Sequence, residues 1–264
     1  MARINPDSSF TGSLGSLSFY HMRGVDKPIV RTKGGASKQK IKTHPRFEST
    51  RRINAEFGGR ATASKWIMRM LWPQKALADH NIAGPLNALM KPVQALDLAS
   101  ADGQRHIPLS QYPSILDGFS LNRKTGFDSI VRTHIGCSLS REKLQVRVDI
   151  PALLPGINLH MPKTHPWYAI TVVFGIIPDL FYAPYQYIPM NEYGGVAPLV
   201  RMTDWYPALE GSADTTLELI HPITPPDEYF SIMISIGIRF GMSRSATQID
   251  QVPHAGAARV LAMA

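Results

Sequence analysis

The chain has 264 residues, of which 44% are hydrophobic and 18% are charged, and its formal net charge is +8. This composition is sufficient for a buried core and excludes a disordered chain. The single cysteine, Cys137, excludes an intramolecular disulfide and a cysteine-based zinc site.

The positive charge is concentrated at one end of the chain. Residues 1–75 carry 15 Lys and Arg against 4 Asp and Glu, whereas residues 76–264 carry 13 against 16. A basic head on a near-neutral body is expected to attract polyanions: nucleic acid, an anionic membrane surface or an acidic protein surface.

The N-terminal residues lack the apolar core of a signal peptide. The longest apolar runs, at 170–177 and 232–238, are shorter than the roughly 20 residues that a membrane-spanning helix needs. We therefore expect a cytoplasmic protein without a membrane span, or one that a dedicated non-classical route exports as part of an assembly.

The first predicted element is a short β-hairpin. Apolar and small residues mix over 14–22, and residues 29–32 are expected to pair back on them across the turn at 23–28. Four lysines and two adjacent glycines follow in residues 33–42, which is typical of a flexible basic loop. Such a charge run is as often a solvated surface as a binding site.

Residues 44–98 show the apolar spacing of helices. The first helix is expected to bury Phe47, Ile53 and Phe57 on one face and to end at the glycine pair 58–59.

Two more helices are predicted after that glycine pair. One runs from about residue 61 to Pro73, and the other covers residues 86–96, where Pro92 is expected to interrupt it.

Residues 105–264 have the alternation and proline-rich turns of β structure. Strands are expected at 129–133, 144–150, 168–177, 216–220, 229–240 and 258–263. Without intervening helices they favour an antiparallel β-sandwich, Ig-like or jelly-roll-like, with a closed barrel as the alternative. The last strand is expected at an open sheet edge, where another subunit would add a strand.

The predicted fold class is therefore α+β, with an N-terminal hairpin and helices followed by an antiparallel β-sandwich. We expect two domains, a basic hairpin and helical region over residues 1–104 and a β-sandwich over residues 105–264.

No catalytic motif is convincing. Residues 140–143 match S-x-x-K and residues 124–126 match K-T-G of the penicillin-recognising enzymes, but they stand in the wrong order and too close together. His160 and His165 have no cysteine or carboxylate at metal-ligand spacing. Cys137 is expected to be a buried structural thiol. We expect no enzyme activity, no cofactor and no metal.

The candidate binding site is distributed over the basic head. Its predicted polyanion-binding residues are Lys33, Lys38, Lys40, Lys42, Arg46, Arg51, Arg52, Arg60 and Lys65. Lysines and arginines of this kind neutralise phosphates, and the interleaved Phe47, Trp66 and Trp72 would stack on bases if exposed. These rings fit a helix core equally well. No DNA- or RNA-binding motif is visible, so any contact with nucleic acid through residues 31–69 would not be sequence-specific.

The N-terminal third carries a resemblance. Its residues include Gly12-Ser-Leu-Gly15 before Tyr20, then the basic loop, then Arg51 and Asn54-Ala-Glu-Phe-Gly-Gly59. This order resembles the start of an uncharacterised family of Bacteroidota hypothetical proteins, and similar basic openings occur in prophage-associated proteins. The resemblance implies a β-rich body and no known activity, and it favours a structural or assembly role.

Three functions remain open. The first is a non-enzymatic structural or interaction protein that forms a homo-oligomer or binds a protein partner, with the basic head docking on an anionic partner or neighbouring subunit. The second is a non-specific nucleic-acid-binding protein. The third is a carbohydrate-binding module that uses aromatic residues at 167–168, 182–187 and 205–206.

Overall fold

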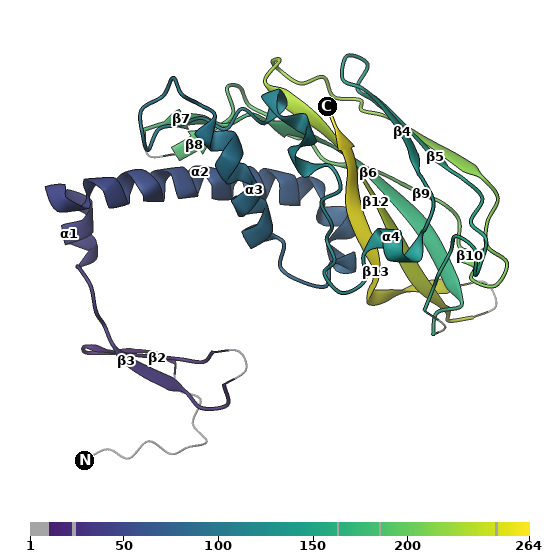
Figure 1. The fold of residues 1–264 in the computed structure, drawn as a ribbon, viewed down its shortest axis with the longest axis horizontal. Helices are drawn as coiled ribbons and strands as arrows, with labels where there is room; N and C mark the ends of the chain where they lie inside the picture. The colour runs from purple at the N-terminus through teal and green to yellow at the C-terminus, as the bar shows by residue number, and fades with distance from the viewer. Residues whose placement is uncertain (1–10, 23–24, 163, 185, 246–247) are drawn as a thin grey trace. The chain divides into compact units, whose positions relative to one another are not determined.

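The computed structural model describes residues 11–22, 25–162, 164–184, 186–245 and 248–264. The chain forms two compact units, Met1–Arg51 and Arg52–Ala264, which we call the N-terminal unit and the body. The boundary expected at residue 104 therefore falls within the body. The predicted α+β fold class is confirmed, because helices precede several sheets whose strands all pair antiparallel (Figure 1).

The N-terminal unit contains a small sheet and short helices. Strand β2 (Leu17–Tyr20) lies between β1 (Gly12–Leu14) and β3 (Ile29–Thr32), as the predicted hairpin requires. Helix α1 (Lys38–Thr43) and the 3-10 helix η1 (Pro45–Phe47) follow. The flexible loop expected at 33–42 is thus wrong in part, since its second half is helical.

The body contains two larger antiparallel sheets. One has the order β10–β6–β12–β13, with β9 also paired to β6, and the other has the order β11–β5–β4. Their strands are β4 (Gly136–Ser140), β5 (Gln145–Ile150), β6 (Trp167–Pro178), β9 (Leu199–Met202), β10 (Tyr206–Pro207), β11 (Thr215–Ile220), β12 (Phe230–Ser243) and β13 (Ile249–Met263). A separate hairpin pairs β7 (Phe181–Ala183) with β8 (Gln186–Ile188).

The two larger sheets enclose the first core of the body. Ile234 and Ile236 of β12, with Val172 of β6, face Val146 and Val148 of β5, and all five side chains are buried. This is the face-to-face packing of a β-sandwich. The alternation in residues 144–150 and 229–240 therefore matches the buried faces of β5 and β12.

Helices cover the opposite face of the larger sheet and enclose the second core. They are α2 (Glu48–Met70), the 3-10 helix η2 (Trp72–Leu77) and α3 (Ala83–Ala95). Met70 packs over Gly175 of β6. A Cβ atom added to Gly175 would lie 2.6 Å from the Cβ atom of Met70. The fully buried Gln74 donates a hydrogen bond from Nε2 to the carbonyl of Thr171 (3.1 Å). The body is thus a β-sandwich backed by helices (Figure 1).

The expected end of a helix at Gly58 and Gly59 is wrong, because α2 continues through both. Gly59 is instead a packing position, since a Cβ there would lie 2.6 Å from the ring of Tyr187. The expected burial of Ile53 and Phe57 is also wrong, because these side chains are 61% and 55% exposed. This stripe of α2 is therefore open to solvent in the part of the chain that the structure describes.

Two other local expectations are wrong. Helix α3 includes Pro92 without interruption. The strand expected at 129–133 is replaced by a short helix, α4 (Phe127–Ile130), whose Phe127 and Ile130 are buried one turn apart. The segment between α3 and α4 contains two 3-10 helices, η3 (Leu109–Gln111) and η4 (Pro113–Leu116).

No helix among the described residues is long and apolar enough to cross a membrane.

The outer edge of the C-terminal part of β13, residues 258–263, is covered by the chain itself. Residues 117–122 run along it: the amide of Val260 donates to the carbonyl of Phe119 (2.9 Å), and the amide of Leu121 donates to the carbonyl of Ala258 (2.9 Å). The open edge expected at this strand is therefore wrong, and these backbone groups are not available for strand addition.

The neighbouring glycines of α2 give a matched test of the helix–sheet packing. A Cβ at Gly58 meets no atom within 4 Å, so Gly58→Ala should stabilise the body by up to about 1 kcal/mol through helix propensity. Gly59→Ala puts the same methyl group against Tyr187 and should destabilise by about 1–3 kcal/mol. Urea unfolding measures both, and a stabilising Gly59→Ala would contradict the packing.

Candidate polyanion interface

Four unengaged cations of the N-terminal unit lie on α1 and η1. Lys38, Lys40 and Lys42 belong to α1, which buries no residue, and Arg46 lies in η1. All four side chains are exposed, and none of their charged groups pairs with another side chain in the described part of the chain. Ser37 caps α1 by accepting a hydrogen bond from the amide of Lys40 (3.2 Å).

No acidic residue lies within α1. Lys38 and Lys42 are four residues apart, so they share one side of the helix and repel each other. An anionic surface that docks on this helix would relieve the repulsion, and that gain adds to the direct attraction between opposite charges.

Two of the predicted cations are instead engaged by main-chain oxygen atoms. Lys33 Nζ donates to the carbonyl of Gly15 (3.0 Å) in the β1–β2 turn. The Nη1 atom of Arg51 donates to the carbonyls of Ile41 (2.9 Å) and His44 (3.0 Å) at the C-terminal end of α1. Helix ends leave such carbonyls unpaired, so Arg51 acts here as a capping residue.

The other three predicted cations belong to the body. Arg52 and Lys65 are exposed on α2. Arg60 is partly buried, with its guanidinium 5.8 Å from the ring centroid of Phe57. Burial raises the pKa of Tyr187 to about 12, and the positive charge of Arg60 opposes that shift. Arg60 therefore acts within the packing of the body.

The aromatic residues interleaved with the cations are mostly packed. Phe47 is partly buried and meets the ring of His44 edge-on, with 6.3 Å between centroids. Trp66 is partly buried against Tyr193 at 6.4 Å. Trp72 is 63% exposed. The prediction that these rings pack in a helix core therefore applies to Trp66. Among the described residues of the N-terminal unit, no row of exposed aromatic rings is present.

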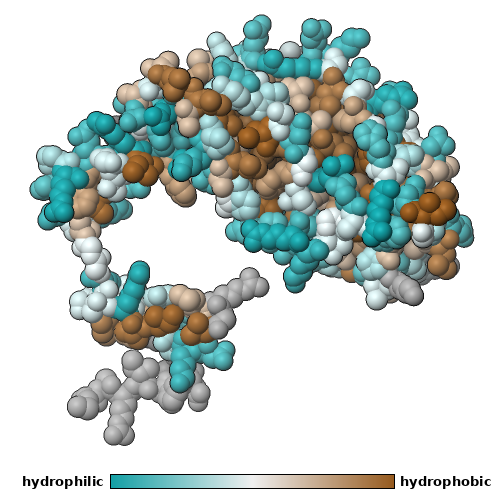
Figure 2. Space-filling view, viewed as in Figure 1, coloured by the Kyte–Doolittle hydropathy of each residue, from teal (hydrophilic) through white to brown (hydrophobic). Residues whose placement is uncertain are grey.

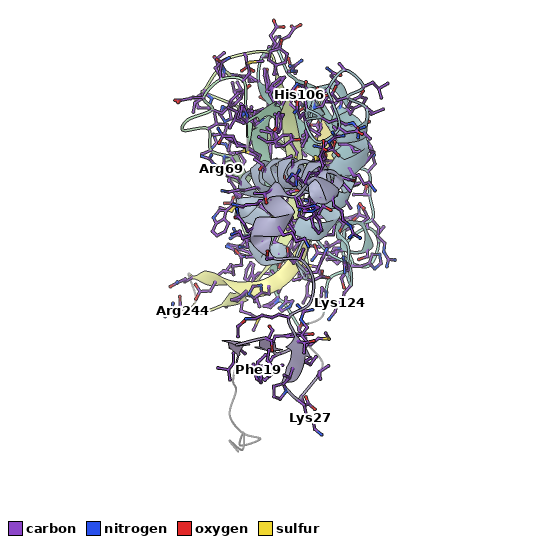
Figure 3. All side chains as sticks on the ribbon, turned by 90° about the vertical axis from the view of Figure 1, so that its left-hand side faces the viewer. Phe19, Lys27, Arg69, His106, Lys124 and Arg244 are labelled. Atoms are coloured by element: carbon purple, nitrogen blue, oxygen red, sulfur yellow. The ribbon has the colours of Figure 1, made fainter. Side chains whose placement is uncertain are left out.

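The sheet of the N-terminal unit has an apolar face that the sequence analysis missed. The strand register places Leu14, Leu17, Phe19 and Val30 on this face. Leu14 is 65% and Val30 49% exposed, and Figure 2 shows apolar atoms along the small sheet. Among the described residues of the unit only Phe19, labelled in Figure 3, is buried. The signal was the alternation in residues 14–20.

The charge asymmetry follows the two units closely. The N-terminal unit has 10 Lys and Arg against 3 Asp and Glu, a net charge of +7. The body has 18 against 17, a net charge of +1. Nearly all of the excess positive charge thus belongs to a unit that has almost no core.

The aromatic residues considered for sugar binding do not share one groove as far as the structure describes them, and Tyr185 lies outside the described residues. Tyr168 is fully buried, Tyr187 is 7% exposed, and Trp205 lies under Arg239 with 4.8 Å between the guanidinium carbon and the ring centroid. Trp167 lines a cavity of about 760 Å³ at the end of the sandwich. Single rings in separate places do not form the row on which a sugar chain stacks.

The structure also shows where the candidate residues for metal binding and nucleophilic catalysis lie. His160 and His165 both line that cavity. In the described ranges, no three His, Cys, Asp or Glu side chains are grouped to hold a metal ion. Cys137 is only partly buried, not fully buried as expected. Its partial burial, reinforced by the charges of Asp117 and Asp149, raises the pKa of the thiol to about 11, so the thiol is protonated and a poor nucleophile at neutral pH.

No family model matches the chain, and neither a curated protein nor a solved structure matches it. The resemblance to the Bacteroidota family therefore stays a prediction.

The raised pKa of Cys137 gives a direct test with a thiol reagent. At pH 8 the folded protein should react with dithionitrobenzoate roughly 100-fold more slowly than a free cysteine, whose pKa is about 8.5. The rate should rise with pH up to about 11, as the thiolate forms. Protein unfolded in guanidinium is the control, because it exposes the same single thiol. Rapid labelling of the folded protein at pH 8 would contradict the structural role.

Proposed function

We propose that this chain is a non-enzymatic assembly or interaction protein whose N-terminal unit docks on an acidic surface of a protein partner or neighbouring subunit. The observation that carries the proposal is the combination, in one small unit, of a net charge of +7 with a single buried side chain among its described residues. A three-stranded sheet with so little core needs a second surface to cover its apolar face. Exposed cations in the same unit favour an acidic surface.

The apolar face supports a protein partner over nucleic acid. A nucleic-acid backbone offers phosphates to Lys38, Lys40 and Lys42 but no apolar complement to Leu14 and Val30. Proteins bind single strands through open aromatic rings, whereas Phe47, which follows these cations in the chain, is partly buried against His44. Nucleic-acid binding is the alternative that the experiment below distinguishes.

Buried polar groups of the body support a structural role for it. Asp179, 2% exposed, accepts hydrogen bonds from the amide (2.8 Å) and the hydroxyl (2.5 Å) of Ser110. Tyr193 donates from its hydroxyl to Asp227 (2.6 Å). These carboxylates hold loops in place, and the body serves as the stable platform that carries the N-terminal unit.

Neutralising the unengaged cations tests the proposal. The N-terminal variant replaces four residues by Gln: Lys38, Lys40, Lys42 and Arg46. The matched control replaces four exposed cations of the body by Gln: Lys91, Lys124, Lys143 and Arg201. The N-terminal variant should elute from immobilised poly-L-glutamate at clearly lower salt than the wild type, and the control close to the wild type. Equal shifts would contradict docking through the N-terminal unit.

The same proteins, run with and without mixed DNA and RNA, separate the two functions. Docking on protein predicts that light scattering detects nucleic-acid-free association that persists at high salt, because apolar contacts are not screened. Nucleic-acid binding predicts co-migration that falls steeply with salt, with a log–log slope of about −0.9 for each phosphate neutralised on duplex DNA. Salt-sensitive co-migration alone, lost when residues 1–43 are removed, would overturn the protein-docking proposal.

A further inference from the structure

Arg239 stands near the end of β12, on the same face of the sheet that the helices cover farther along the strand. Its neighbours on that face of β12 are glycines. A Cβ atom at Gly237 would lie 2.7 Å from the side chain of Leu77, and one at Gly241 would lie 2.8 Å from the ring of Trp205. Arg239 is thus the only large side chain on this stretch of the face, and Figure 1 shows this end of β12 beyond α2 and α3.

The guanidinium of Arg239 is packed against side chains but has no anionic partner. Its carbon atom lies 4.8 Å from the ring centroid of Trp205, and Nη1 contacts the thioether Sδ of Met202 (2.7 Å), which is a weak acceptor. Nε is buried without a hydrogen-bond partner among the described residues. Arg259 of β13 is also partly buried, but it pairs with Asp128 (3.2 Å). No carboxylate in the described ranges pairs with Arg239 in this way.

An unpaired charge in this position is costly. Partial burial removes water from the guanidinium, and no counter-charge compensates for the lost hydration. Burial lowers the pKa of Arg239, and no charged group in the described part of the chain contributes to that shift. The side chain nevertheless stays protonated at neutral pH, because the usual pKa of arginine is far above 7. An anion bound at its Nη atoms would supply the missing counter-charge.

The surface beside the guanidinium is apolar. The pairing of β9 with β6 places Val200 and Met202 on the face that carries Arg239, and these side chains are 36% and 51% exposed. Arg201 lies between them in sequence and therefore on the opposite face of the strand. A ligand at this place thus meets one positive charge and exposed apolar side chains.

We propose that Arg239 binds the carboxylate of a small apolar monocarboxylic acid, whose apolar body lies on Met202 and Val200. The planar guanidinium fork matches the two oxygen atoms of a carboxylate. A carboxylate carries the single charge that one guanidinium balances, whereas a phosphate group carries nearly two charges at neutral pH. The site belongs to the body and does not depend on docking by the N-terminal unit.

The indole N–H signals of the ¹⁵N-labelled full-length protein report on this site directly. The chain has four tryptophans, and the variant Trp205→Phe assigns the signal of Trp205. Hexanoate should shift this signal saturably, with a dissociation constant of roughly 1–10 mM. Hexanol and phosphate at the same concentrations should leave it in place, because hexanol lacks the charge and phosphate lacks the apolar body.

Substitutions of Arg239 test its part in binding. Arg239→Gln should weaken hexanoate binding by roughly 10-fold or more, because it removes the charged hydrogen-bond donor. Arg239→Lys keeps the charge but loses the planar fork, so its affinity should also fall below that of the wild type. Arg201→Gln is the matched control: it removes a cation from the same strand edge but on the opposite face, and it should bind as the wild type does. Circular dichroism and urea unfolding check that each variant is folded.

Three results would overturn the proposal. The first is a wild-type Trp205 signal that stays in place up to about 50 mM hexanoate, well above the expected dissociation constant. The second is an equal shift in Arg239→Gln and the wild type. The third is a shift of the Trp205 signal by poly-L-glutamate at a lower carboxylate concentration than by hexanoate, which would assign Arg239 to an acidic protein surface instead of a small ligand.

Discussion

The pairing of β6 with β12 is the constraint on which the rest of the body depends. Twelve consecutive residue pairs, from Phe230 with Pro178 to Gly241 with Trp167, fix their register. Because side chains alternate along a strand, this register sends Ile234 and Ile236 into the sandwich core and their neighbours toward the helices. A slip of one residue would exchange the two faces and place glycines where the sandwich needs isoleucines.

The helix side of these strands shows why that register matters. Gly175 and Gly237 are positions where a Cβ would meet Met70 and Leu77 at 2.6 and 2.7 Å. The helices can approach the sheet this closely only because glycine has no side chain at these two positions. The body thus has two cores that share one pair of strands and cover both of its faces. The described residues of the N-terminal unit form no equivalent core, and this difference, together with the charge of the unit, is the reason for assigning it a docking role.

Patterns of period two were the most reliable signal in the sequence. They predicted β5 and β12, because a strand that is packed against a core must place its apolar residues regularly. Local rules failed where packing overrides them. Gly59 lies within a helix because the ring of Tyr187 needs its space, and Ile53 has helical spacing although nothing covers it.

The candidate site was predictable only as a region. Composition locates the basic segment, but it does not distinguish Lys42, which is unengaged, from Arg51, which bonds the end of α1. The cavity lined by Trp167 was not predictable at all, because its walls come from segments that are distant in sequence and adjacent only in the fold. The number of charged residues can be counted from the sequence. The hydrogen bonds that these residues form, and the cavities of the protein, are determined only by the folded structure.

Hydrogen exchange of the full chain, measured in dilute and in concentrated solution, tests the central claim that the body is stable alone while the N-terminal unit is covered only by a partner. Amides of β6 and β12 should be protected for hours at both concentrations. Amides of β2 and β3 should exchange rapidly in the dilute protein and slowly in the concentrated protein. Strong protection of β2 and β3 in the dilute monomer would contradict the account, because the unit would then need no second surface.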